Sequence, residues 1–198
     1  KDTMEEQIRR AEDAAGSLKD AFDFRPQTWI LPKHKSEMEK YLKSTEKEDT
    51  EAKGEREIFI AKPSGLNRGD GIFLFHSLSQ YETEAKKRPD ILEEYVVQRY
   101  VQKPLLIHGY KFDLRLYVLV SSFWPLRLHL YRNGLVRFCS EPYSTLSDEE
   151  LHNPFRQLTN YSVNKKNTLT NYSANKKNTP TKPSPSTVTI NDTPNPSL

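Results

Sequence analysis

The densest pattern of apolar positions lies in the middle of the chain, between residues 58 and 138. Two short apolar runs, 58–61 and 71–75, flank a turn that contains glycines, and residues 95–101 form a third run. Runs of this length, bounded by turn-forming residues, are typical of strands. We therefore predict three short strands in the first half of this region.

A longer pattern follows. Residues 112–120 alternate apolar and polar side chains, as expected of one strand with a single buried face. Two further apolar runs, 126–131 and 135–138, flank Asn133-Gly134, a dipeptide that favours a two-residue hairpin. The central region is thus expected to be an α+β domain rich in antiparallel sheet.

The N-terminal part is polar and rich in helix-forming residues. We expect residues 1–21 to form a peripheral helix, since this segment has few aliphatic side chains that could pack into a core. Residues 22–32 carry aromatic residues and prolines and are interpreted as a loop that docks on a core. Residues 33–57 are highly charged, which predicts a short helix followed by a mobile loop.

The C-terminal part is repetitive. Residues 158–168 are followed by a second copy, 169–179, which differs only by Ala174 in place of Val163. Two copies are too few for a solenoid. Residues 180–198 are rich in proline, threonine and serine and have no aromatic residue, so we expect a disordered tail.

Composition restricts the class of protein. The 198 residues include 35% hydrophobic and 29% charged residues, and no apolar run is long enough for a membrane span. A single cysteine, Cys139, excludes an internal disulfide and favours an intracellular setting. The five histidines lack metal-ligand spacing and no Cys/His cluster occurs, so we predict no zinc site. The chain begins with Lys1, shows no secretory signal, and is expected to be a fragment.

Charge is distributed unevenly. The net charge is +3, yet residues 151–198 hold six basic side chains and one acidic one. A basic end of this kind favours a polyanionic partner, which leaves nucleic acid, nucleotide phosphate and acidic peptides as alternatives.

Two groups of residues are the main candidates for chemistry. Residues 62–71 form a glycine-rich turn in which Lys62 or Arg68 would neutralise phosphate, although an ordinary glycine hairpin fits the same pattern. Lys111, Asp113 and Arg115 alternate and so share one strand face, where they would hold a phosphate or a carboxylate, or simply face solvent.

The remaining candidates are weaker alone. Arg137 follows the expected hairpin and would add a third cation to the same cavity, although hairpin residues are often surface charges. Residues 98–101 would offer backbone groups to an adenine ring, or form a plain core strand. Residues 159–162 are polar and favour a turn.

Taken together, several long blocks in order resemble the tubulin tyrosine ligase-like family, particularly its polyglutamylases. These blocks are FIAKPSGLNRGDGIFLF, YVVQRYVQKPLLIHGYKFDLRLYVLVSS, PLRLHLYRNGLVRF, EPYS and NPFRQLTNYSVNKKN. The resemblance covers residues 22–167, which we interpret as a partial domain of that family.

The resemblance implies an ATP-grasp-like fold, with antiparallel sheets, flanking helices and, here, an incomplete C-terminal subdomain. It implies nucleotide contacts at Lys62, Arg68, Gly69, Gln98, Arg99, Tyr100, Val101, Lys111, Asp113, Thr159 and Asn160. It implies catalytic contacts at Arg115 and Arg137, and an amino-acid pocket formed by Arg137, Tyr161, Ser162 and Lys165.

The implied activity is protein polyglutamylation. ATP would activate a glutamate side chain in the acidic C-terminal tail of tubulin as an acyl phosphate, and free glutamate would attack it. The expected setting is the cytoplasm and the cytoskeleton, including cilia, axonemes and basal bodies, with neither a membrane nor a nucleic acid as partner. A catalytically defective module that binds tubulin and microtubules is the alternative.

One departure from the family concerns Mg²⁺. Family members carry an Asp and a Glu-x-Asn motif beyond the LTNYS block, and Thr189 stands where that Glu would be. Because these metal ligands are absent, the sequence predicts no more than trace ligase activity for the chain as given.

Overall fold

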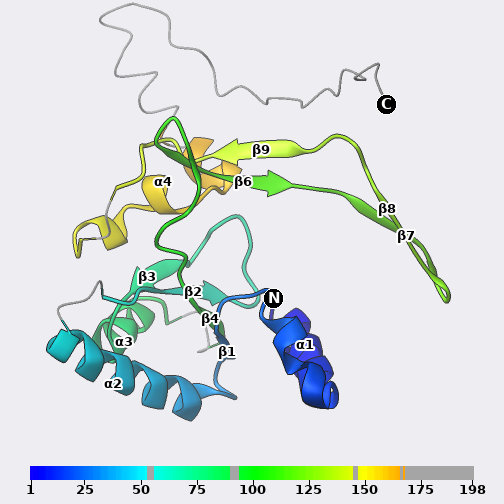
Figure 1. The fold of residues 1–198 in the computed structure, drawn as a ribbon. Helices are drawn as coiled ribbons and strands as arrows, with labels where there is room; N and C mark the ends of the chain where they lie inside the picture. The colour runs from blue at the N-terminus through cyan, green and yellow to red at the C-terminus, as the bar shows by residue number, and fades with distance from the viewer. Residues whose placement is uncertain (53–55, 90–93, 145–146, 166, 168–198) are drawn as a thin grey trace, which may run out of the picture. The chain divides into compact units, whose positions relative to one another are not determined.

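The computed structural model describes residues 1–52, 56–89, 94–144, 147–165 and 167 (Figure 1). The chain divides into two compact units. The first consists of Lys1–Pro104 and Thr145–Pro154, and the second of Leu105–Ser144 and Phe155–Leu198. Both contain antiparallel strands, and helices flank the sheet of the first, so the expected mixture of α and β structure is confirmed.

A four-stranded antiparallel sheet forms the centre of the first unit. Its strands are β1 (Thr28–Ile30), β2 (Phe59–Pro63), β3 (Phe73–Phe75) and β4 (Tyr95–Arg99), in the order β1-β4-β2-β3. The three strands predicted from the apolar runs are confirmed. The interpretation of residues 22–32 as a loop was wrong in part, because residues 28–30 pair with β4 at the sheet edge.

The core of this unit lies on one face of the sheet. Alternate side chains of the four strands, among them Trp29, Phe59, Phe75 and Val97, are fully buried there. Helices α2 (Lys35–Ala52) and α3 (Leu78–Lys86) cover this face, as Figure 1 shows. The expected short helix after residue 33 is in fact an 18-residue helix, since its few apolar residues recur at helical spacing and reach the core.

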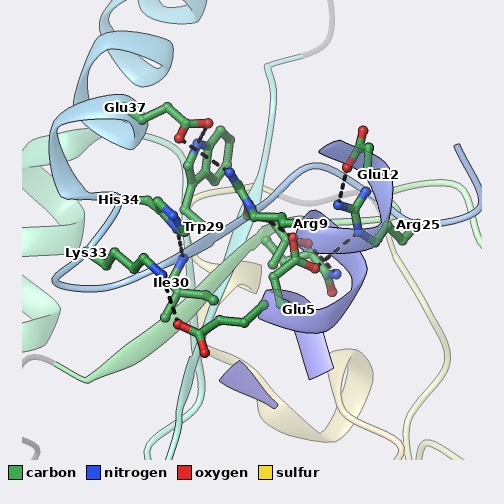
Figure 2. A network of polar contacts seen from close by, with 12 residues as sticks. Glu5, Arg9, Glu12, Arg25, Trp29, Ile30, Lys33, His34 and Glu37 are labelled. Atoms are coloured by element: carbon green, nitrogen blue, oxygen red, sulfur yellow. Dashed lines mark hydrogen bonds and ion pairs between the residues drawn. The ribbon is translucent and has the colours of Figure 1, made fainter. Parts of the chain in front are cut away.

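Helix α1 (Asp2–Ala14) and the 3₁₀ helix η1 (Gly16–Phe22) form the N-terminal segment, as the sequence predicts. Figure 2 shows how ion pairs attach α1 to the chain around β1. The buried carboxylate of Glu5 pairs with Arg9 and Arg25, at 3.1 Å in each case. A second 3₁₀ helix, η2 (Glu150–His152), completes the first unit.

The second unit contains two sheets and all but the first residue of the short helix α4 (Pro154–Gln157). One sheet is three-stranded, in the order β5 (Leu106–Ile107), β6 (Tyr110–Arg115), β9 (Leu135–Phe138). The other is a ribbon of β7 (Val118–Phe123) and β8 (Leu126–Leu130).

Two predictions about this unit were wrong. Residues 112–120 form two strands, because regular pairing is interrupted after Arg115. Asn133-Gly134 does not join a hairpin, since β8 pairs with β7 and β9 pairs with β6 (Figure 1). The hairpin turn lies instead at Trp124-Pro125, because the long-range register of β6 with β9 outweighs the local turn preference.

The second repeat copy, 169–179, and the tail, 180–198, lie outside the described residues. The expectations for them, and for the boundaries of the partial domain, stay predictions. No described helix is both long and apolar enough to span a membrane.

Candidate functional site

A row of three polar side chains crosses the face of the first sheet that lies opposite the core. Thr28 and Gln98 are register partners on β1 and β4, and Lys62 lies two residues from the β2 position opposite Gln98. The Lys62 Nζ donates to Gln98 Oε1 at 2.8 Å, and Gln98 Nε2 donates to Thr28 Oγ1 at 2.9 Å. Strand alternation thus brings two predicted nucleotide contacts together.

Lys62 is a partly buried cation. Desolvation lowers the pKa of its ammonium group, and the nearby positive charge of Lys1 lowers it further. Among the residues described, Lys62 forms no ion pair with a carboxylate. A cation in this state is suited to receive an anion, because none of its charge is already neutralised.

The turn after β2 holds Arg68 and Gly69. Both have positive φ angles, +59° and +92°, and Gly71 follows at +70°. A non-glycine residue rarely adopts this conformation. Backbone N–H groups in turns with left-handed residues can bind anions, so the turn fits the predicted contact with phosphate.

The predicted adenine segment, residues 98–101, is only partly free to bind a base. The N–H of Arg99 donates to Gln27 O at 2.9 Å, and the N–H of Tyr100 donates to Ile58 O at 2.8 Å. The Arg99 guanidinium pairs with Glu57 at 2.6 Å. Val101 follows these hydrogen-bonded residues and is exposed. It borders a cavity of about 770 Å³ within the first unit.

In the second unit, Asp113 and Arg137 face each other across β6 and β9. Arg137 Nε donates to Asp113 Oδ1 at 2.7 Å, and its Nη2 donates to Oδ2. This two-fold contact raises the pKa of Arg137. Arg137 and Asp113 are therefore in direct contact, while their convergence on a shared cavity and the roles assigned to them stay predictions.

The neighbours of Asp113 on β6 differ in exposure. Lys111 Nζ donates to the Gln157 carbonyl at 3.0 Å. Arg115, at the end of the strand, is exposed. This face of β6 therefore carries an exposed cation, Arg115, and a second cation, Lys111, that is hydrogen-bonded to a backbone carbonyl.

The predicted residues Thr159, Asn160, Tyr161, Ser162 and Lys165 also belong to this unit, where residues 161–165 are helical. The Asn160 carbonyl accepts from the N–H of Asn164 at 3.1 Å. The ammonium of Lys165 lies 5.8 Å from the centre of the Tyr161 ring. Thr159, Asn160 and Ser162 are partly buried, whereas Tyr161 is exposed.

Sequence reasoning missed two residues. Thr28 completes the row with Gln98 and Lys62. Asn164 is buried, accepts from the N–H of Ser140 at 2.7 Å and donates to Leu158 O at 2.7 Å, which ties the polar segment to the chain just after β9. The four-residue spacing of Asn160 and Asn164 was the available signal for the second, while nothing in the sequence marked Thr28.

The described residues contain no cluster of three or more Asp, Glu, His or Cys side chains that would hold a metal ion. The carboxylate of Asp113 is also occupied by Arg137. These residues therefore do not fit a protein-held Mg²⁺.

Known proteins similar to this chain share its family. Residues 1–191 match the tubulin-tyrosine ligase family. The tubulin monoglutamylase TTLL4 of Mus musculus is 44% identical over 85% of the chain, and a probable β-tubulin polyglutamylase of Tetrahymena thermophila is 40% identical over 75%. The tubulin polyglutamylase ttll-5 of Caenorhabditis elegans is 36% identical over 85%.

The chain spans only part of these relatives, 12%, 11% and 22% of their respective lengths. The family match over residues 1–191 includes every block on which the resemblance in the sequence rests. The chain belongs to the tubulin-tyrosine ligase family.

Proposed function

We propose that the chain is part of an ATP-dependent ligase with an ATP-grasp-like fold that adds glutamate to glutamate side chains of tubulin tails. The observation that carries this proposal is its similarity to proteins named tubulin monoglutamylase or polyglutamylase, over three quarters of the chain or more. The proposed setting is the cytoskeleton, including cilia.

The proposed reaction has two steps. A γ-carboxylate oxygen of the tubulin tail attacks the γ-phosphorus of ATP, ADP leaves, and an acyl phosphate forms. The α-amine of free glutamate then attacks the carbonyl carbon and loses a proton, phosphate leaves, and an isopeptide bond results. Negative charge grows on the phosphoryl group in the first step and on the carbonyl oxygen in the second, so fixed cations favour both.

The chain supplies such cations. Lys62, without a carboxylate partner in the described residues, supports the role of phosphate contact. The exposed guanidinium of Arg115 is available to a reacting carboxyl group. Arg137 fits the carboxylate of the incoming amino acid less directly, because its Nε and Nη2 groups already donate to Asp113. No step here depends on a metal held by the described residues.

The test is incorporation of labelled glutamate into tubulin by the protein that carries this sequence, with ATP present. A Lys62→Met variant is the active-site control, and Lys33→Met, which alters an exposed lysine paired with Glu6, is the matched control. We expect Lys62→Met to lower incorporation roughly a hundredfold or more and Lys33→Met to leave it unchanged. Failure to incorporate glutamate, or equal rates in both variants, would refute the proposal.

A second candidate function is a tubulin-binding module without turnover. The observation that favours it is the charge of residues 105–140, where Lys111, Arg115, Arg127, Arg132 and Arg137 accompany a single acidic residue, Asp113. A surface of this charge attracts acidic peptides in a salt-dependent manner. Sedimentation with intact and tail-cleaved microtubules tests it, and binding that is indifferent to the tails would exclude it.

A further inference from the structure

The orientation of one amide side chain links β1 to the candidate phosphate-binding lysine. We propose that Thr28 is a positioning residue whose hydroxyl fixes the carboxamide of Gln98, which in turn fixes the Lys62 ammonium. This inference rests on the proposed nucleotide site and adds a residue to it that neither the sequence nor the similarity to relatives indicated.

The Thr28 hydroxyl has a single proton to donate. Thr28 Oγ1 lies 2.8 Å from the Pro26 carbonyl, which can only accept, so the hydroxyl donates its single proton there. Towards Gln98, at 2.9 Å, Thr28 Oγ1 can therefore only accept. The Gln98 NH₂ group must face Thr28.

The consequence for Lys62 follows from the geometry of an amide. With its NH₂ group turned to Thr28, Gln98 presents Oε1 to the Lys62 ammonium at 2.8 Å. The flipped amide would place two N–H donors against an ammonium that has no acceptor. Thr28 thus selects the one orientation in which Gln98 can hold the lysine.

Thr28 is itself held from the other side. The guanidinium of Arg9 donates to the Thr28 carbonyl, and Arg9 is bound by the buried carboxylate of Glu5 at 3.1 Å. Figure 2 shows Glu5 between Arg9 and Arg25, which also donates to it. The Glu5–Arg9 ion pair of α1 therefore holds the β1 backbone at Thr28, the residue that orients Gln98.

The choice of a neutral partner matters for function. A carboxylate at the position of Gln98 would neutralise Lys62 and compete with an incoming phosphate. An amide oxygen directs the ammonium and leaves its full charge for the ligand. Burial already lowers the pKa of Lys62, so this acceptor also helps to keep the lysine protonated.

The experiment compares Thr28→Val, which keeps the shape and removes the hydroxyl, with Thr28→Ser, which keeps the hydroxyl. The readout is the pKa of Lys62 from NMR of lysine labelled at Cε, with its signal identified by its loss in Lys62→Arg. We expect Thr28→Val to lower this pKa by about one unit, as loss of a hydrogen bond to a charged group would do. Thr28→Ser should change it little.

A second variant links the residues. Gln98→Met removes both ends of the amide, and we expect it to lower the pKa of Lys62 as Thr28→Val does, with no further change in the double variant. The inference is wrong if the two substitutions have additive effects on the pKa of Lys62, or if Thr28→Val leaves that pKa unchanged. If Thr28→Val does not fold, Thr28→Ala replaces it in the same cycle.

Binding of a non-hydrolysable ATP analogue, measured by calorimetry, is a separate readout. We expect roughly tenfold weaker binding in Thr28→Val than in Thr28→Ser. The lysine titration is made without nucleotide. If the wild type binds no ATP analogue, the proposed function fails, while the titration still decides whether Thr28 positions Lys62.

Discussion

At the scale of single residues, polar groups inside the chain divide into those that hold the fold and those that strain it. Asn164 belongs to the first kind, because its amide satisfies the backbone around it. Lys62 belongs to the second, because its charge is desolvated and meets only a neutral acceptor in the described residues. Residues of the second kind are concentrated at functional sites.

This predicts that Lys62→Met stabilises the chain. Methionine retains most of the aliphatic stem and removes a desolvated charge, so we expect the melting temperature to rise by roughly 2–4 °C. The pKa of Lys62 is lowered in the folded state. The destabilisation that the buried charge causes is therefore complete at pH values below this folded-state pKa. It decreases as the pH rises from there towards the pKa of Lys62 in the unfolded chain, so the rise in melting temperature in Lys62→Met should become smaller at alkaline pH. A lower melting temperature at pH 7 would contradict this account.

A second prediction concerns Cys139, which is buried. Burial raises the pKa of its thiol to about 11. Because the thiolate is the reactive form, the native thiol should react with a disulfide reagent at pH 8 at least a hundredfold more slowly than in denatured chain. Cys139 is the only cysteine, so the reagent reports this thiol alone. Equal rates in native and denatured protein would show that the thiol is accessible.

At the scale of elements, the second unit is organised by one irregular junction. Arg115 pairs with Leu135 on β6 and β9, and Val118 pairs with Leu130 on β7 and β8. Two residues on one side of the junction therefore oppose four on the other. The N–H of Tyr131 still donates to Tyr117 O at 2.9 Å, so the extra residues bulge out between two paired segments.

Gly134 in this bulge predicts a mutational contrast. A Cβ at Gly134 would lie 2.8 Å from the Arg115 carbonyl oxygen and 3.1 Å from a methyl group of Leu116. We expect Gly134→Ala to lower the free energy of unfolding by roughly 1–3 kcal/mol. Gly65→Ala is the control, since a Cβ there meets nothing within 4 Å. Urea unfolding measures both, and equal stabilities would show that the junction relaxes without cost.

At the scale of the whole chain, the two units differ in how far their apolar side chains are buried. The first buries an aromatic cluster beneath its sheet. In the second, the β7–β8 ribbon exposes one apolar face, formed by Val118, Val120, Phe123, Leu126, Leu128 and Leu130. A register shift between Val120 and Ser122 keeps Phe123 on that face. The opposite face carries Arg127, and a hydrogen bond joins Ser121 and His129.

An apolar face of this kind predicts concentration-dependent association of the purified chain. Leu128→Lys places a charge on the apolar face, and Leu119→Lys places one on the opposite face, at a position of similar exposure, 65% against 57% for Leu128. Light scattering over a concentration series should show weaker association for Leu128→Lys than for Leu119→Lys. Identical behaviour would assign association to another surface.

Much of the first sheet could be predicted from the sequence, because β2, β3 and β4 are apolar runs bounded by turn residues. Strand β1 could not, since Thr28–Ile30 lies between Pro26 and Pro32, in a stretch whose aromatic residues and prolines favour a loop. In the candidate site, alternation placed Lys111, Asp113 and Arg115 on one face. The Asp113–Arg137 contact needed the β6–β9 register, which no local pattern encodes.

The class of fold, the position of the glycine-rich turn and the family follow from the amino-acid sequence alone, because they depend on residue types in order along the chain. The strand that pairs with β8, the side chain that holds Lys62 and the contact between Thr28 and Gln98 became visible in the folded chain. Those facts depend on register between distant segments, and a shift of one residue would send Thr28, Gln98 and Lys62 to opposite faces.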